Sequence, residues 1–214
     1  GDLPAFILTW MLLSLPLVYL FNASTPAALY LAGIAAWTGN VMHEGSQKLC
    51  FWALLILFIP HYATAMIRDA GGFRATALSW ALLACMSVAT GLSIEGVMPG
   101  IWIVVYASLM TSIYLVGTLW FDDAPSAWRR PFQTIGQRGI VVLSFILTFR
   151  EPWRHIGWHY YGARGYQTTF GAAADYAMTI SLTILAVSLL LRCVRNGKTP
   201  SLFLGVMPAL AIVG

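Results

Sequence analysis

The chain has 214 residues, of which 59% are hydrophobic and only 9% are charged, and its mean hydropathy is +0.75. Because soluble domains carry about 25% charged residues, this composition excludes a soluble globular protein and predicts an integral membrane protein. The net charge of +4 comes without any Lys/Arg-rich motif, so it suits contact with anionic membrane lipids and argues against a nucleic-acid partner.

Charge-free apolar runs predict seven membrane helices, since a span needs about 20 mostly apolar residues. In chain order they lie at 4–21, 26–42, 49–67, 75–93, 99–120, 133–150 and 173–192. An eighth apolar segment starts at 201 and ends at Gly214, too short to cross about 30 Å at 1.5 Å per residue. We therefore expect an all-α, polytopic transmembrane helix bundle with at least seven spans. It would form a single domain over 1–214, with an incomplete last helix, and be a fragment of a longer chain.

The short loops predict that consecutive helices pack as antiparallel neighbours. Small residues that recur every four positions predict faces of close helix approach. Ala32, Ala36 and Asn40 form one such face on the predicted span 26–42, and Ala77, Ala81 and Cys85 form another on the span 75–93.

Basic residues in alternate loops predict how the helices are oriented in the membrane. Four lie on the side shared with the N-terminus: Lys48, Arg150, Arg154 and Arg164. Eight lie on the other side: Arg68, Arg74, Arg129, Arg130, Arg138, Arg192, Arg195 and Lys198. Because cytoplasmic loops carry the excess of basic residues, we expect the N-terminus of this segment to lie outside. The first apolar segment has no basic region before it, so no cleavable signal peptide is expected.

The longest predicted cytoplasmic loop, 121–139, contains apolar residues at helical spacing. Trp128, Phe132 and Ile135 form this stripe, which predicts a short interfacial helix leading into the sixth span. Pro131 predicts a break between the two helices, because proline cannot continue a helix from the preceding turn.

Few ionisable residues lie inside the predicted spans, and His61 is the deepest candidate. Such a residue commonly serves transport or ligand binding. His61 follows Pro60, which has no backbone N–H and so frees a carbonyl one turn earlier. We interpret His61 first as a structural hydrogen-bonding residue, with an intramembrane polar site as the alternative. Asp175 is placed in the first turns of the seventh span, where the helix dipole favours a carboxylate, and is interpreted as a cap.

The segment "FREPWRHIGWHYYGARGY", 149–166, gathers basic and aromatic residues on the predicted outer face. Arg150, Arg154 and Arg164, together with Trp153, fit a clamp for an anionic lipid-linked head group, since arginine binds phosphate through paired hydrogen bonds. Membrane physics alone also places such residues there, because Trp and Tyr concentrate at interfaces and arginines snorkel to the head groups. A docking surface for another protein fits the same residues.

Two histidines in that segment, His155 and His159, share one face of a short helix that Pro152 can begin. Their spacing lets two imidazoles meet one metal ion. Candidate third ligands on the same predicted side of the membrane are Glu44, Glu95 and Asp175. The HExxH pattern of catalytic zinc sites is missing, since Ile156 stands where its glutamate would be. We predict no cofactor and keep a metal or haem site at the histidine pair as an alternative.

Four stretches carry a family resemblance: "GDLPAFILTWMLLSLPLVYL", "IPHYATAMIRDAGG", "GLSIEGVMPGIWIVVYASLMTSIYLVG" and "WRRPFQTIGQRGIVVLSFILTFREPWR". Their distinctive elements are Pro-His-Tyr, Trp-Arg-Arg-Pro and Phe-Arg-Glu-x-Trp-Arg. The chain resembles a bacterial family of polytopic inner-membrane proteins of unknown function, found beside GDYXXLXY-type membrane proteins. The resemblance implies a multi-pass protein of the bacterial inner (cytoplasmic) membrane and brings no activity or catalytic residue with it.

These observations lead to one functional hypothesis. We expect a non-enzymatic scaffold or accessory component that docks a membrane or extracytoplasmic protein through its outer 150–171 loop. The first alternative is an enzyme or flippase that handles an anionic lipid-linked substrate at the same face. The second is a small-solute permease, which the scarcity of charge inside the spans argues against.

Overall fold

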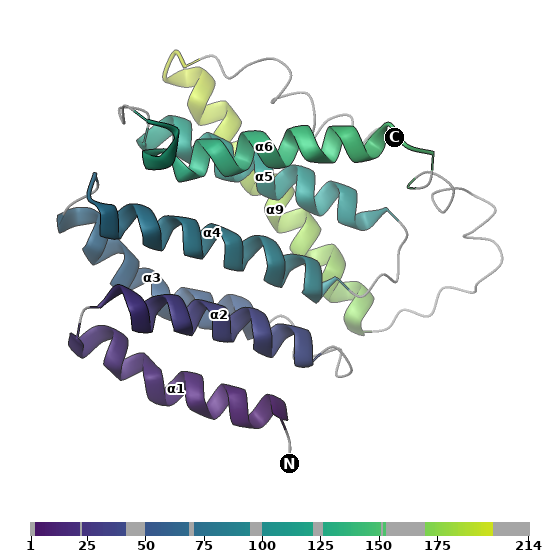
Figure 1. Ribbon diagram of the computed structural model, residues 1–214. Coiled ribbons are helices and arrows are strands. Elements are labelled where there is room, and N and C mark those ends of the chain that lie inside the picture. The colour runs from purple at the N-terminus through teal and green to yellow at the C-terminus, as the bar shows by residue number, and fades with distance from the viewer. Residues whose placement is uncertain are drawn as a thin grey trace. The chain divides into compact units, whose positions relative to one another are not determined.

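The computed structural model describes residues 3–21, 23–41, 50–68, 71–94, 100–121, 126–150, 152 and 170–198. In these ranges all regular secondary structure is helical, with seven α-helices and one short 3-10 helix (Figure 1). The chain divides into two compact units, Gly1–Ile94 and Glu95–Gly214. Unit 1 contains α1 (Leu3–Phe21), α2 (Ser24–Asn40), α3 (Cys50–Arg68) and α4 (Phe73–Ser93). Unit 2 contains α5 (Ile101–Trp120), η1 (Ala127–Arg129), α6 (Pro131–Leu147) and α9 (Phe170–Arg195).

Five of these helices are long and apolar enough to cross a membrane: α1, α3, α4, α5 and α9. The all-α, membrane-type fold class is therefore confirmed, and the predicted bounds of the seven helices differ from the observed ones by three residues at most. α2 and α6 have 17 residues each, about 25 Å at 1.5 Å per residue, which is shorter than a typical hydrocarbon core. The expectation of seven or more spans is thus supported for five helices, and the segment from 201 lies outside the described residues.

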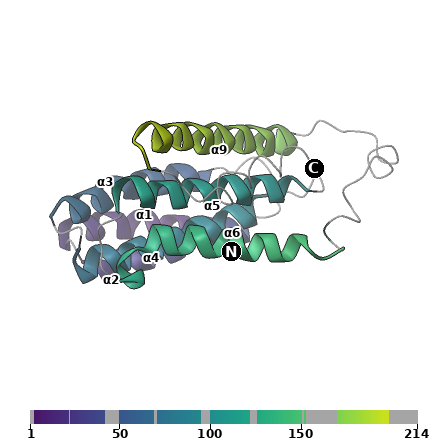
Figure 2. The same ribbon diagram turned by 90° about the horizontal axis from the view of Figure 1, so that it is seen from above.

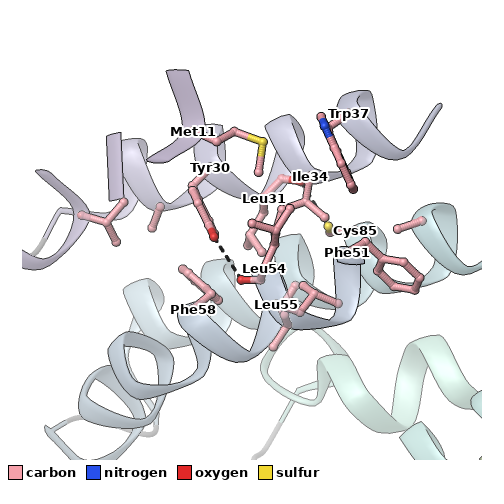
Figure 3. Close-up of a cluster of buried hydrophobic side chains, with 14 of the residues drawn as sticks. Met11, Tyr30, Leu31, Ile34, Trp37, Phe51, Leu54, Leu55, Phe58 and Cys85 are labelled. Carbon is pink, nitrogen blue, oxygen red and sulfur yellow. Dashed lines mark hydrogen bonds between the residues drawn. The ribbon is translucent and has the colours of Figure 1, made fainter. Parts of the chain in front are cut away.

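In unit 1, α2 is the central helix and contacts α1, α3 and α4. α2 and α3 supply equal shares of the buried cluster shown in Figure 3, where Tyr30, Leu31 and Ile34 of α2 point between the neighbouring helices. Phe51 and Phe58 enter the cluster from α3. The core of unit 1 is therefore a layer of large apolar side chains on both sides of α2.

The face of α2 that contacts its neighbours is not the one predicted from small residues. Ala32, Ala36 and Asn40 are exposed, so that expectation is wrong for α2. Close approach occurs instead at Gly33, where an added Cβ would lie 2.8 Å from Cγ of Met11 in α1. A glycine about 60° around α2 from Ala36 therefore determines how near α1 can come. On α4, Ala77 and Ala81 are half-buried, and Cys85 is buried and bonds to the carbonyl of Leu31.

Hydrogen bonds between helices hold unit 1 together. Each joins an uncharged side chain of one helix to a backbone carbonyl or a hydroxyl of another. They run from Tyr19 Oη to Leu57 O (2.5 Å), from Tyr30 Oη to Leu54 O (3.0 Å), from Cys85 Sγ to Leu31 O (3.1 Å) and between Tyr62 Oη and Ser79 Oγ (2.7 Å). Such bonds supplement van der Waals packing between helices that are equally apolar on every side.

In unit 2, α5 lies between α6 and α9, as the view in Figure 2 makes plain. α6 crosses α5 at glycines: an added Cβ at Gly136 would lie 2.6 Å from the backbone nitrogen of Tyr114, and one at Gly117 would lie 2.7 Å from that of Gln133. A hydrogen bond of 3.1 Å joins Ser108 in α5 to Thr183 in α9. Unit 2 is thus a three-helix layer with its closest backbone contact between α5 and α6.

The connection between α5 and α6 bears out the predicted break at Pro131. Pro131 is the first residue of α6, a position at which its missing N–H is not needed. The rings of Phe121 and Phe132 stack with centroids 5.0 Å apart. The preceding helix is only the three-residue η1, in which Trp128 is exposed, so the predicted interfacial helix is shorter than its apolar stripe indicated.

Candidate functional site

His61 is a predicted site residue that the structure describes inside a membrane-type helix. It lies in α3 directly after Pro60, and its side chain is only 2% exposed. The ring of Tyr19 meets it edge-on with centroids 5.7 Å apart, and the ring of Phe58 lies 5.8 Å away at 46°. The imidazole is therefore enclosed by aromatic rings from α1 and α3.

The nitrogen Nε2 of His61 is buried and has no hydrogen-bond partner among the described residues. A buried polar atom without a partner costs about 1–3 kcal/mol, so most such atoms in proteins are paired. The expectation that His61 is a satisfied structural residue is thus not supported at Nε2. Nε2 of His61 is therefore a buried polar atom of a predicted site residue for which the described residues supply no partner.

The turn of α3 before His61 lacks one backbone hydrogen bond and receives one from a side chain. Pro60 has no N–H to offer the carbonyl of Ile56, which leaves that turn of α3 one hydrogen bond short. The hydroxyl of Tyr19 donates to the neighbouring carbonyl of Leu57 at 2.5 Å. Tyr19 thereby contacts both the imidazole and the backbone beside the proline, and it joins α1 to α3 at this point.

Further polar groups lie on the side of α4. Tyr62 Oη and Ser79 Oγ are 2.7 Å apart, and Ser79 Oγ also donates to the carbonyl of Ala75. Arg74, near the start of α4, is close enough to interact electrostatically with His61. The imidazole of His61, the hydroxyls of Tyr62 and Ser79 and the guanidinium of Arg74 therefore lie on adjacent parts of α3 and α4.

The groups around His61 are hydrogen-bonding groups. Across the described ranges, no three His, Cys, Asp or Glu side chains are grouped closely enough to hold a metal ion. One imidazole alone supplies a single ligand, whereas protein zinc sites use three or four. The chemistry available at His61 is thus donation or acceptance of a hydrogen bond in an apolar, aromatic surrounding.

Of the residues predicted for the clamp and the histidine pair in the outer segment, the structure describes only Arg150. Arg150 is exposed just beyond the end of α6, and the preceding Phe145 and Phe149 form a T-shaped pair with centroids 5.1 Å apart. The remaining predicted residues of this face lie outside the described ranges: Trp153, Arg154, His155, His159, Arg164, Glu44 and Glu95. The proposed clamp and the histidine pair therefore stay predictions.

Asp175 is a buried carboxylate that sequence reasoning misassigned. α9 begins at Phe170, so Asp175 lies beyond the first turn and cannot be its N-cap. Its side chain is 3% exposed, on the face that also carries the buried residues Leu182 and Ala186. The missed signal was the residue spacing, because Asp175 falls in register with these apolar residues along one face of the helix.

Hydroxyl groups continue the polar line from Asp175 along α9. Thr179 follows one turn later and Thr183 two turns later, where it meets Ser108 of α5 at 3.1 Å. Thr111, also in α5, has a buried hydroxyl with no hydrogen-bond partner among the described residues. At about 100° per residue it lies within roughly 60° of Ser108 around α5. Unit 2 therefore contains a polar track between two otherwise apolar helices.

No family model, no curated protein and no solved structure matches this chain at a significant level. The residues themselves show a helical protein of membrane type with a buried imidazole in unit 1 and a buried carboxylate in unit 2.

Proposed function

We propose that this chain is part of a multi-pass protein of the bacterial inner membrane, of the family that it resembles, and that it acts as a non-enzymatic scaffold or accessory component. In this role the helices form a rigid platform, and the outer 150–171 segment docks a membrane or extracytoplasmic protein.

The observation that supports a scaffold most directly is how unit 1 uses its polar groups. Tyrosine, serine and cysteine side chains there bond to neighbouring helices and so fix the helix arrangement. Among the described buried side chains, only His61 and Asp175 belong to types that change charge near neutral pH or carry a carboxylate. Transporters and pumps that move protons or ions usually use more such residues along the pathway.

The described edge of the outer segment has the composition of a docking surface. Phe145 is 63% exposed, Phe149 is 53% exposed, and Arg150 follows directly. Aromatic residues and arginine are enriched in the energetic centres of protein interfaces. The end of α6 therefore offers both apolar area and a charged hydrogen-bond donor next to the proposed docking loop.

We also propose seven spans, with α2 and α6 as short ones and the N-terminus of this segment outside. Short spans are accommodated by local thinning of the bilayer at a modest free-energy cost. Within unit 1 the described basic residues Arg68 and Arg74 flank the turn between α3 and α4, and within unit 2 the basic residues gather mainly where α5 and α9 end and α6 begins. Fusions of a reporter that is active only outside the membrane, placed after residues 22, 69, 122 and 198, should all be inactive. An active reporter at any of these points would contradict the orientation.

The docking proposal is tested by replacing Arg150, Arg154, His155 and His159 with alanine together in the full-length protein. We expect cross-linking and co-purification from native membranes to lose specific protein partners, while expression and thermal unfolding stay unchanged. The matched control is Arg129→Gln with Arg195→Gln, which removes two exposed arginines from the other end of unit 2. Equal loss of partners in both variants, or no loss in either, would remove the support for docking at the outer segment.

Two other outcomes would favour the alternatives. Stoichiometric zinc, copper or iron in the purified protein, lost in a His155→Ala/His159→Ala variant, would replace docking by a metal site. Turnover of a lipid-linked substrate that depends on Arg150 and Arg154 would indicate the enzyme or flippase.

The small-solute permease is the second candidate function, because one structural observation favours it. Asp175 is buried in α9 and is followed by hydroxyl residues that reach Ser108 of α5. A carboxylate inside a membrane helix marks a functional site more often than a structural one. Uptake that Asp175→Asn abolishes in proteoliposomes, without loss of folded protein, would support the permease over the scaffold.

A further inference from the structure

Six basic residues of unit 2 gather where α5 and α9 end and α6 begins. They are Arg129, Arg130, Arg138, Arg192, Arg195 and Lys198. Asp122 and Asp123 lie between α5 and η1 in the sequence, outside the described residues. Counted along the sequence, the segments 121–139 and 192–198 carry a formal charge of +4, six basic minus two acidic residues.

Specific contacts hold the three helix ends together. The guanidinium carbon of Arg192 lies 5.2 Å from the centre of the Trp120 ring, which is a cation–π distance. Lys198 Nζ donates a hydrogen bond of 2.6 Å to the carbonyl of Thr118, near the end of α5. The stacked phenylalanine rings described above join the end of α5 to the start of α6. The arginines at this junction therefore lie on helix ends that contact one another.

Four of these arginines are exposed, and three of them are grouped here with two half-exposed tryptophans. The five residues are Arg129, Arg192, Arg195, Trp120 (51% exposed) and Trp128 (53% exposed), and we call them the basic rim. Tryptophan at the end of a membrane helix lies at the level of the lipid head groups. An arginine at the same level can bind a phosphate with two parallel hydrogen bonds.

Apolar surface continues directly from the basic rim along α9. Leu191 is 56% exposed and Val194 is 60% exposed, and Leu191 lies one turn before Arg195 on the same side of the helix. A ligand that fits both parts must have an anionic head and an apolar body. A free phosphate ion or a nucleic acid would use only the arginines.

We propose that the basic rim binds an anionic phospholipid of the inner leaflet, with the head-group phosphate at the arginines and the acyl chains along the exposed side of α9. Arg192 is positioned for this by Trp120, and Arg129 is positioned by η1, whose Ala127 carbonyl accepts a hydrogen bond from Thr134 of α6. This inference is independent of the proposed docking function, because it concerns the opposite end of unit 2.

The test is native mass spectrometry of the full-length protein in detergent micelles, titrated with phosphatidylglycerol or with phosphatidylcholine. The variant is Arg129→Gln/Arg195→Gln, since both side chains are exposed. The matched control is Arg68→Gln, which removes an exposed positive charge but leaves the basic rim intact, and it is compared with Arg195→Gln alone. Because each basic residue near a membrane surface strengthens anionic-lipid binding about fivefold, we expect the variant to bind the first phosphatidylglycerol roughly 30-fold more weakly. The control should bind as the wild type does.

Three results would overturn the proposal. The first is equal affinity of the wild type for phosphatidylglycerol and phosphatidylcholine. The second is equal weakening in the variant and the control, which would show a general effect of charge. The third is a rise in thermal stability with inorganic phosphate that equals the rise with phosphatidylglycerol, which would show a free-anion site. The wild type gives an independent check, since 1 M salt shortens the Debye length to about 3 Å and should release the bound phosphatidylglycerol.

Discussion

The hydroxyl of Tyr30 in α2 donates a hydrogen bond of 3.0 Å to the backbone carbonyl of Leu54 in α3, drawn as the dashed line in Figure 3. The same ring stacks at 22° on Phe58, with centroids 6.2 Å apart, and Tyr30 is completely buried. One side chain thus supplies both apolar contact area and a directional bond between two helices. This combination lets the two contributions be separated by mutation.

We expect Tyr30→Phe to lower the free energy of unfolding by only about 0.6 kcal/mol, and by less than about 2, because hydrogen bonds between membrane helices are weak on average. Tyr30→Ala should cost about 3–5 kcal/mol, since it also removes the ring and leaves a cavity. Unfolding of the purified protein by SDS in mixed micelles measures both values. Equal losses in the two variants would show that the hydroxyl, and not the ring, holds α2 against α3.

The crossing of α5 and α6 gives a second prediction. Gly136→Ala would place a methyl group 2.6–2.7 Å from backbone and Cβ atoms of Tyr114, so the two helices must separate. We expect a loss of about 1–3 kcal/mol or more, as for other overpacked sites. The matched control is Gly39→Ala in α2, whose nearest new contact would be a Leu92 methyl at 3.4 Å and whose helix propensity improves. The same unfolding assay compares them, and a Gly136→Ala variant as stable as the control would contradict the close crossing.

The helix positions could be predicted from the sequence, because charged residues and prolines mark the ends of the apolar runs. The break before Pro131 and the ends of α1 and α5 show this. Sequence did not show which face of each helix is buried. α1 is apolar all round, with only Met11 and Val18 buried, so its hydrophobic pattern has no direction.

The candidate sites were harder to predict for the same reason. Gly136 and Gly139 on α6 are three residues apart and would have signalled a close crossing, whereas the alanines of α2 gave a false one. The prediction of a cap at Asp175 is wrong because α9 begins at Phe170, and the apolar and small residues around Ala173 do not mark that start. His61 was found by its chemistry, but its aromatic surroundings depend on Tyr19 of another helix, which no local pattern reveals.

Cysteine accessibility tests the proposed orientation together with the packing. Cys50 is exposed at the start of α3, whereas Cys85 and Cys193 are buried. We expect a membrane-impermeant maleimide to label Cys50 from the outer side of intact cells or spheroplasts, and the other two only after denaturation in SDS. Cys50→Ser should abolish the native signal. Labelling only in inside-out vesicles would reverse the orientation, and native labelling of Cys85 would contradict its burial in unit 1.

Replacing His61 tests whether it has a structural or a ligand-binding role in the interior of unit 1. Replacement by phenylalanine keeps an aromatic ring against Tyr19 and Phe58 and removes Nε2, which has no partner among the described residues. Since an unpaired buried polar atom costs about 1–3 kcal/mol, we expect His61→Phe to be as stable as the wild type or more stable, after allowing for the larger ring.

His61→Ala serves as the comparison, because it removes the ring as well and should be less stable by about 2–5 kcal/mol. SDS unfolding of the purified variants measures both changes, and co-purification of partners from native membranes measures function. A large loss of stability in His61→Phe would show that Nε2 has a polar partner in the membrane. Retained stability with lost function would instead show that the imidazole holds a polar ligand, because the packing around Tyr19 would still be intact.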